Sequence, residues 1–345
     1  MSFKRLDPED FIFSAESTTA PAWSTNKITL EEMQTSSVQE GGFQGNYYLS
    51  IFQTNSVENS SQVQFDIAFG DKNGRGASPY TTGLIPSYTS TIYGQYQNII
   101  YGDENNDFFF NNISQSAFYA LNVSRNRYKE KLLPGTFNIR LTDQTGTNTL
   151  ILTDNSKDIT SLSFTEAGRV YQLVSGSNGR AISQEVTRES AIAPGMTKSG
   201  SYGLFLPDIG TIILNAPALD NPIVDGGIVL GTKYTATGTE KNPSTLFNFI
   251  SRSADFKLNY EETITSDFVF VRARNAEFNY SENPSYISGS QGVVIYDQFI
   301  NNPQTYITSV GLYNDNNDLL AVAKLSKPLK KDFTKEALIR VKLDF

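Results

Sequence analysis

Three kinds of stretch in this 345-residue chain have residue types that could do chemistry. Residues 103–107 and 315–318 combine Asp with other oxygen-bearing side chains, which are the ligands that calcium prefers. An EF-hand loop also needs Gly at its sixth position and a bidentate Glu at its twelfth, and neither stretch has them. We therefore interpret both stretches as solvated Asx turns that hold no metal.

Residues 71–76 contain two Gly around an Arg, which suggests a phosphate-binding loop. No Gly-Lys-Ser/Thr ending follows, and residues 78–80 (Ser-Pro-Tyr) do not begin a helix, so we predict a turn. Glu261 and Glu262 could serve as the acid/base pair of a glycosidase. Adjacent strand residues point to opposite faces, however, so we expect these two glutamates to lie in a solvated turn.

The absence of Cys and His excludes the commonest catalytic devices. Without them the chain has no thiol nucleophile, no disulfide, no Cys/His zinc site and no Ser-His-Asp relay. The net charge of −8 disfavours binding to nucleic acid, because neutralising phosphates needs a basic surface. No apolar run reaches the ~18 residues of a membrane span, and the start lacks a signal-peptide core. We expect a non-enzymatic protein without cofactors, made in the cytoplasm, that binds neither nucleic acid nor membranes.

Composition predicts an all-β fold. Charged residues make up only 19% of the chain, while 18 Tyr, 23 Phe and 25 Gly favour strands joined by turns over long helices. We expect mainly antiparallel, β-sandwich-like sheets with long loops and one or two short helices. The predicted organisation is an extended N-terminal arm (1–45), a β-rich domain (46–215), a loop or boundary rich in Pro, Gly and Thr (216–243), and a C-terminal β domain (244–345).

Local patterns predict individual elements. We expect a strand and then a short helical turn within 113–133, an aromatic loop at 84–101, and one helix at 244–252 with Ser244 as its N-cap. Alternating apolar residues predict paired strands at 47–52 with 63–69, 136–142 with 149–153, and within 202–215, and further strands at 169–174, 256–260 and 268–273. Trp23, close to Pro21 in the arm, suits either an anchor on another subunit or a local core plug.

The C-terminal 43 residues have the clearest pattern. Residues 306–313 and 319–325 alternate as two strands around an Asn/Asp turn, which predicts a β-hairpin. A basic connection follows, and the last strand places Ala337, Ile339, Val341, Leu343 and Phe345 on one face. The C-terminus is therefore expected to belong to a sheet or to a subunit contact.

Charge is distributed unevenly along the chain. Residues 319–345 hold seven Lys or Arg against three Asp or Glu, so the remainder carries a net charge of −12. This asymmetry could steer heterologous packing between subunits. It could equally be a solvated basic edge that protects an exposed strand from aggregation.

Several segments resemble virion structural proteins of contractile-tailed bacteriophages, especially the myoviruses that infect marine cyanobacteria. The similar segments are residues 20–23, 200–210, 272–286, 302–315 and 320–328, so the resemblance spans most of the chain. Residues 307–325 are also similar to the Gly-Leu-Tyr turn pattern of tail-fibre and baseplate proteins. The resemblance points to a phage particle protein without fixing its place in the particle, and it provides no catalytic residues.

The resemblance implies a structural role in the tail or baseplate, in the virion, after assembly in the host cytoplasm. The expected partners are other virion proteins and copies of the chain itself. A head- or neck-associated protein and a fibre that binds the host surface are the alternatives, and a glycosidase that digests cell wall is a third. The candidate assembly contacts are the aromatic and basic residues Trp23, Tyr306, Tyr313, Lys324, Lys327, Lys330, Lys331 and Phe345.

Overall fold

The computed structural model describes residues 3–36, 45–55, 58, 60–77, 87–103, 105–182, 198–235, 239–289 and 291–344. Strands make up 44% and helices 14% of the structure, and the large sheets are antiparallel, which confirms the all-β class. The described residues contain four α-helices, whereas the sequence predicted one or two.

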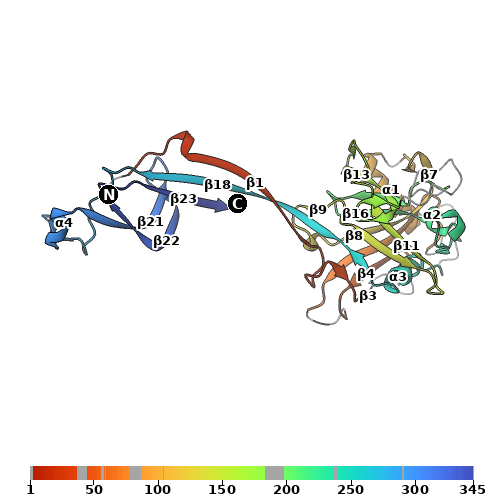
Figure 1. Ribbon diagram of the computed structural model, residues 1–345. Coiled ribbons are helices and arrows are strands. Elements are labelled where there is room, and N and C mark those ends of the chain that lie inside the picture. Colours follow the sequence, from red (N-terminus) through yellow and green to blue (C-terminus); the bar gives the residue numbers. More distant parts are fainter. Residues whose placement is uncertain are drawn as a thin grey trace. The chain divides into compact units, whose positions relative to one another are not determined.

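The chain divides into two units (Figure 1). The larger unit is Thr18–Glu262, and the smaller unit combines Met1–Ser17 with Thr263–Phe345. Both boundaries fall inside long strands, β1 (Phe11–Pro21) and β18 (Asn259–Ala273), which pair with each other. The expected boundary at 216–243 lies inside the larger unit, because residues such as Ala216, Leu219 and Leu230 are buried in that unit's core.

The larger unit is built on a 13-stranded sheet in which neighbouring described strands pair antiparallel. Its main path runs β2-β17-β10-β11-β13-β15-β16-β8-β5-β4-β3, with β12 and β14 pairing with β13. The bounds are β2 (Thr29–Leu30), β3 (Gln34–Ser36), β4 (Tyr48–Phe52), β5 (Val63–Asp71), β8 (Ala117–Val123), β10 (Asn138–Thr142), β11 (Thr149–Asp154), β12 (Ser163–Thr165), β13 (Gly168–Ser177), β14 (Arg180–Ala181), β15 (Gly203–Leu206), β16 (Thr211–Asn215) and β17 (Phe256–Lys257). The three hairpins predicted from alternation are confirmed as β4–β5, β10–β11 and β15–β16.

Short elements complete the larger unit. They are β6 (Phe108–Phe110) paired with β7 (Ile113–Gln115), β9 (Lys131–Leu132) paired with β18, the 3-10 turns η2 (Arg125–Arg127) and η4 (Ile223–Asp225), and the helices α1 (Tyr88–Tyr101), α2 (Ala216–Asp220) and α3 (Asn242–Ser251). The strand and helical turn expected within 113–133 are thus β8 and η2.

Two local predictions in the larger unit are wrong. The expected aromatic loop at 84–101 is largely helix α1, because Ser87 caps its start, Gly102 ends it in a left-handed conformation, and Tyr93, Gln97 and Ile100 form one buried face. Helix α3 begins with Pro243 in its first turn and Lys241 at the N-cap position, so Ser244 lies inside the helix and does not cap it.

The sheet of the larger unit curls onto itself around an aromatic core. The rings of Phe65 on β5 and Phe256 on β17 are 5.2 Å apart, although six strands lie between β5 and β17 in the sheet order. On the other face, Phe118 and Ala120 of β8 belong to a second cluster with Tyr93 and other residues of α1. Central strands such as β8 are thus buried on both faces, which explains their continuous apolar sequence.

The smaller unit contains β-strands and little helix. Besides parts of β1 and β18, it contains η1 (Pro8–Asp10), β19 (Ile287–Ser288) paired with β20 (Val293–Val294), α4 (Asp297–Asn301), β21 (Gln304–Tyr313), β22 (Leu319–Asp332) and β23 (Ala337–Asp344). The predicted C-terminal hairpin is confirmed as β21–β22, and the last strand alternates as predicted, with Ala337 and Val341 buried and Leu338 and Arg340 exposed.

Two further predictions change in this region. The basic connection after the hairpin is part of β22, because Lys330 and Lys331 lie opposite Tyr306 and Thr305 of β21. The strands predicted at 256–260 and 268–273 are present, but the break expected between them is wrong, since β18 runs without interruption from Asn259 to Ala273.

Candidate assembly interface

Five of the eight predicted contact residues come together on the β21–β22 hairpin. Tyr306 and Tyr313 lie on β21, and Lys324, Lys327 and Lys330 lie on β22. Tyr306 is directly opposite Lys330, and the tyrosines, Lys324 and Lys327 are all exposed. Lys330 is half-buried and lies 3.7 Å from the Asp332 carboxylate. The hairpin therefore presents this part of the predicted set to solvent on one element.

Trp23 is a core residue, so its prediction as a subunit contact is not supported. Its side chain is 1% exposed, and its indole Nε1 donates a 2.9 Å hydrogen bond to the carbonyl of Phe256. Its ring centroid lies 4.8 Å from that of Phe256 and 6.1 Å from that of Phe65. The core-plug alternative describes Trp23 correctly, because no face of the indole is left for a neighbouring subunit.

Lys331 is also buried, and this corrects its prediction as a contact residue. Its ammonium group donates hydrogen bonds to the carbonyl of Asn275 (2.9 Å), the side-chain oxygen of Asn279 (2.9 Å) and the carbonyl of Asp332 (3.1 Å). Three acceptors satisfy the three ammonium donors, so the side chain anchors the 275–279 turn to β22. Phe345, the eighth predicted residue, lies outside the described residues.

The turn end of the hairpin carries an exposed apolar cluster, made of Phe3, Tyr313, Leu319 and Val322. The rings of Phe3 and Tyr313 meet edge to face with centroids 5.1 Å apart. The Tyr313 ring and a Leu319 methyl group both lie over Gly311, where an added Cβ would meet them at 2.9 and 3.3 Å. All four side chains are nevertheless exposed, Val322 by 61%. The cluster is thus organised within the chain but covered by nothing that the structure describes.

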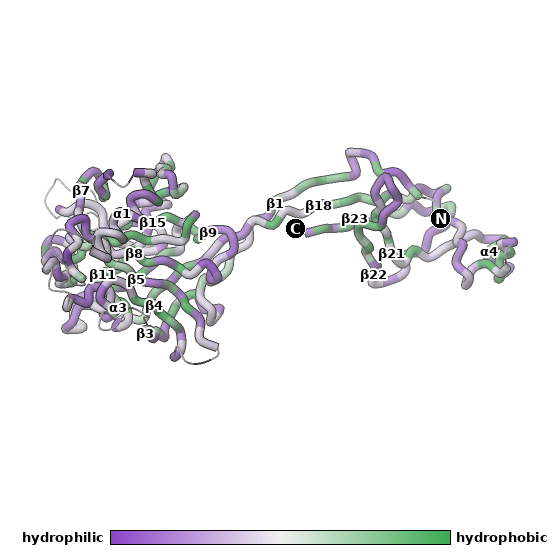
Figure 2. The backbone as a smooth tube through the Cα atoms, turned by 180° about the vertical axis from the view of Figure 1, so that it is seen from behind, coloured by the Kyte–Doolittle hydropathy of each residue, from purple (hydrophilic) through white to green (hydrophobic). Residues whose placement is uncertain are grey.

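The smaller unit as a whole exposes apolar side chains instead of burying them. It supplies 17 of the 28 large apolar side chains that are exposed among the described residues, but only five of the 54 buried hydrophobic residues, alanines included. Both hydrophobic core clusters lie in the larger unit. Figure 2 shows hydrophobic stretches along the strands of the smaller unit. The described ranges include all of this unit except residues 1, 2, 290 and 345.

The β1–β18–β23 sheet has strand edges at both sides. β18 is central, and among the described residues β1 and β23 each pair only with β18. Phe11, Ile12 and Phe13 of β1 are all exposed, Phe13 by 72%. Adjacent strand residues point to opposite faces, so β1 exposes apolar side chains on both faces of the sheet. The sequence analysis assigned this Phe-Ile-Phe run to no interface, although its position ahead of a polar, extended stretch was the available signal.

Charged side chains lie on one face of this sheet. The guanidinium of Arg340 and the ammonium of Lys342 lie 5.4 and 5.9 Å from the Phe268 ring centroid. Lys342 is 4.0 Å from Glu16 of β1 and 3.1 Å from Asp344. A hydrogen bond from Ser266 and the charge of Lys342 lower the pKa of Asp344. These side chains stay largely exposed, so the ion pairs contribute little stability and leave the charges accessible.

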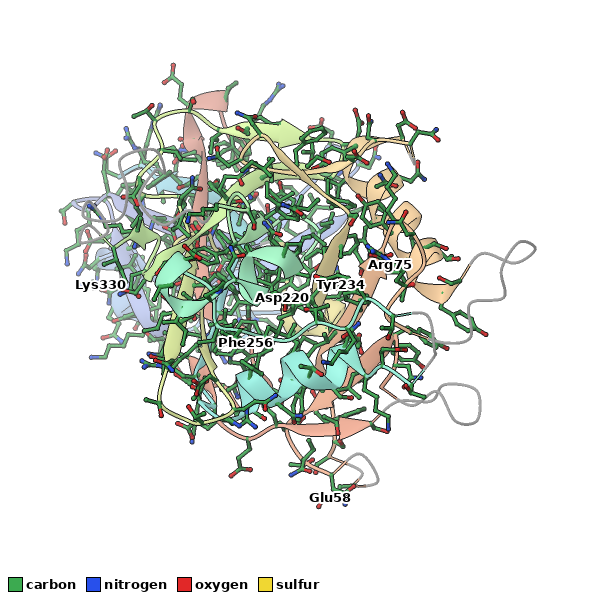
Figure 3. The ribbon with its side chains drawn as sticks, turned by 90° about the vertical axis from the view of Figure 1, so that its right-hand side faces the viewer. Glu58, Arg75, Asp220, Tyr234, Phe256 and Lys330 are labelled. Carbon is green, nitrogen blue, oxygen red and sulfur yellow. The ribbon has the colours of Figure 1, made fainter. Side chains whose placement is uncertain are left out.

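The larger unit contains a polar network that is an alternative candidate site (Figure 3). Tyr234 donates a 2.8 Å hydrogen bond to Asp220, and the Arg75 guanidinium lies 5.4 Å from the Tyr234 ring centroid. Burial, and then the charge of Asp220, raises the pKa of the Tyr234 hydroxyl. Arg75 also pairs at 2.9 Å with the buried carboxylate of Asp71. Because these groups satisfy one another within the chain, the network connects two loops and has a structural role.

The other stretches with chemical potential also have local partners. Asp71 accepts hydrogen bonds from the backbone of Asn73 and Arg75, so residues 71–76 form the predicted turn. Asp103 accepts the backbone N–H of Asn105 as an Asx turn. Glu261 and Glu262 lie in β18, contrary to the predicted turn, and approach Lys131 and Lys129 at 3.8 Å. The described residues contain no acidic cluster that could hold a metal ion and no helix long and apolar enough to cross a membrane.

Comparisons with protein-family models, with curated proteins and with solved structures give no match to this chain. Its function must therefore be inferred from its residues and from the geometry of the smaller unit.

Proposed function

We propose that this chain is a non-enzymatic virion structural protein of a contractile-tailed phage, which makes β-rich subunit contacts in the tail or baseplate. The observation that carries the proposal is the smaller unit, whose paired strands expose apolar side chains on both faces. The sequence resemblance to virion proteins of myoviruses, including those of cyanobacterial phages, supports the particle as the place where this surface is covered.

The amount of exposed apolar surface fits a stable contact. A large apolar or aromatic side chain has roughly 150–200 Å² of surface, so 17 of them about half exposed present on the order of 1,000 Å². A stable protein interface buries about 800 Å² per partner. A soluble monomer rarely exposes a contiguous apolar patch larger than a few hundred Å² without a binding role.

The two units have different roles: the larger unit forms the stable core, and the smaller unit provides the contact surface. The larger unit has a dense aromatic core and needs no partner to bury it. The smaller unit is held by strand pairing, by the buried Lys331, and by pairs such as Lys4 with Glu277 at 2.8 Å. These contacts fix the backbone of the smaller unit while leaving its apolar side chains available to another subunit.

Locating the chain in particles tests the proposal. Purified phage particles that encode this sequence are analysed by mass spectrometry for the chain and by cryo-electron microscopy for its position. We expect the chain in stoichiometric amounts in the tail or baseplate, with residues of the smaller unit in contact with neighbouring subunits. Its absence from particles, or a purified chain that degrades bacterial cell wall, would overturn the proposal.

The same reconstruction separates the alternatives. A position at the head or neck would retain a structural role but refute the tail or baseplate location. A position at the tip of a fibre, with the smaller unit facing solvent, would favour binding to the host surface. In that case the exposed apolar side chains should contact host material instead of virion subunits.

A further inference from the structure

The two outer strands of the β1–β18–β23 sheet are both available for further pairing. β1 is 11 residues long, contains no Lys or Arg, and has its single Pro at its last position. Natural proteins usually protect an exposed edge strand with Lys, Pro or a covering segment. Residues 11–17 of β1 contain no Lys or Pro, no described strand pairs with β1 except β18, and Phe11–Phe13 add apolar side chains next to this edge.

The two edges carry opposite charge. Residues 7–17, which lead into and include the first part of β1, contain four acidic residues and no basic ones. β23 carries Arg340 and Lys342 against Asp344, a net charge of +1. The 4.0 Å approach of Glu16 to Lys342 within one chain shows that side chains of these two strands are compatible at close range. Opposite charge favours the approach of β1 to β23 and disfavours the pairing of β1 with β1 or of β23 with β23.

Resting on the assembly role proposed above, we propose that β1 of one copy pairs with β23 of a second copy, so that the copies extend this sheet head to tail. Each copy then supplies one acidic, apolar edge and one basic edge. A contact between two different surfaces of identical chains closes into a ring when the rotation between copies allows it. Closure removes both open edges in the same way that a β-barrel does.

A second copy fits these edges better than an unrelated protein does. Both edges belong to one sheet, they have complementary charge, and β23, with eight residues, is long enough to pair with the part of β1 in the smaller unit. A chain that covered only one edge would leave the other open. A second copy that covers the β1 edge of the first leaves its own β1 edge open for a third copy, so every copy makes the same two contacts.

Disulfide trapping tests the pairing, because the natural chain contains no Cys. Four full-length variants each carry one Cys, Ile12→Cys or Phe13→Cys in β1 and Leu338→Cys or Arg340→Cys in β23. They are mixed in pairs under mild oxidation, and the linked peptides are identified by mass spectrometry. We expect disulfides between a β1 variant and a β23 variant, since paired strands bring Cα atoms within the ~4.4–6.8 Å that a disulfide spans.

Three outcomes of the trapping experiment would overturn the proposal. They are links only between two copies of the same variant, links of similar yield to the control variant Leu162→Cys, and the absence of any link. Leu162 is a suitable control because its side chain is 53% exposed and lies in the larger unit.

A charge variant provides an independent measurement. Phe13→Lys places a positive charge on β1 where the basic β23 of the next copy is expected to approach. We expect the concentration for half-assembly, measured by light scattering after size exclusion or by native mass spectrometry, to rise about 30-fold or more, as for an interface hot spot. The matched control is Phe164→Lys on β12, another exposed strand aromatic, which should leave assembly unchanged. Trp23 fluorescence verifies that both variants keep the larger unit folded.

The results separate this inference from the proposed function. A wild-type chain that is monomeric at micromolar concentration but present in particles would refute pairing between copies and retain the virion role, with another particle protein at the edges. A chain that assembles through β1 and β23 but is absent from particles would retain the pairing and refute the virion role.

Discussion

Replacing Trp23 by Ala should strongly destabilise the larger unit. The side chain is buried against Phe65 and Phe256, and its Nε1 satisfies the Phe256 carbonyl at 2.9 Å. Truncating a buried Trp to Ala costs about 3–5 kcal/mol, and leaving a buried carbonyl unpaired adds about 1–3 kcal/mol. We therefore expect a loss of about 4–8 kcal/mol in the free energy of unfolding, which is a large part of the ~5–15 kcal/mol that stabilises a typical domain.

Two further variants separate the packing from the hydrogen bond. Trp23→Phe keeps an aromatic ring but removes the donor, so it should cost about 1–3 kcal/mol. Phe164→Ala removes an exposed aromatic of the same unit and should change stability by no more than about 0.5 kcal/mol. Urea unfolding followed by far-UV circular dichroism gives the free energies, and hydrogen exchange at β5 and β17 localises the effect.

The reasoning would be refuted if Trp23→Ala cost less than about 1 kcal/mol while weakening self-assembly. That result would make Trp23 a subunit contact, which is the alternative that the sequence left open.

Three further predictions concern other parts of the chain. Lys331→Ala should leave the acceptors at 275–279 unpaired, which should speed hydrogen exchange of that turn and lower the free energy of unfolding by about 2 kcal/mol or more. The control Lys327→Ala, at an exposed position, should change both quantities little. Equal effects of the two variants would contradict the anchoring role of Lys331. Hydrogen bonds, of which the one from Asn148 is the strongest, lower the pKa of Asp143 from 3.8 to about 2. The ionised carboxylate therefore stabilises the fold above pH ~4, and this contribution is lost as the pH falls through ~2. Asp143→Asn should flatten the pH dependence of the free energy of unfolding in this range, and an unchanged pH profile would refute the role of Asp143. Deleting residues 337–345 removes the strand that pairs with residues 266–273, so amide hydrogen exchange in the smaller unit should become faster while Trp23 fluorescence stays unchanged. Normal protection of residues 263–336 from hydrogen exchange would show that β23 is dispensable for folding.

The elements that sequence reasoning found are those whose pattern is local. Hairpins such as β10–β11 and β21–β22 combine alternation with a turn rich in Gly, Asn or Asp, and both signals occur within about 20 residues. Helix α1 was missed because Tyr and Gln replace the usual helix formers, although Ser87, Gly102 and the Tyr93 to Ile100 spacing were present. Tertiary burial of that face decides the structure against its composition.

The candidate interface could be predicted only in part. The hairpin residues Tyr306 and Lys324 are exposed as expected, whereas Trp23 and Lys331 are buried because of partners far away in the sequence. Phe256, for example, follows Trp23 by 233 residues. The division into units was missed for the same reason, since the smaller unit joins the two ends of the chain and no local signal marks that joining.

The discontinuity of the smaller unit also sets an order of events during synthesis. Residues 18–262 form one continuous stretch, so the larger unit can fold as soon as that stretch has left the ribosome. β1 is synthesised before the larger unit, but its pairing partner β18 follows about 240 residues later. β1 therefore stays unpaired until β18 has been made. The unit that exposes the apolar edges is therefore completed after the larger unit. A chain whose residues 263–344 have not yet been made has no neighbour for β1, so it cannot present the β1–β18–β23 sheet to another chain.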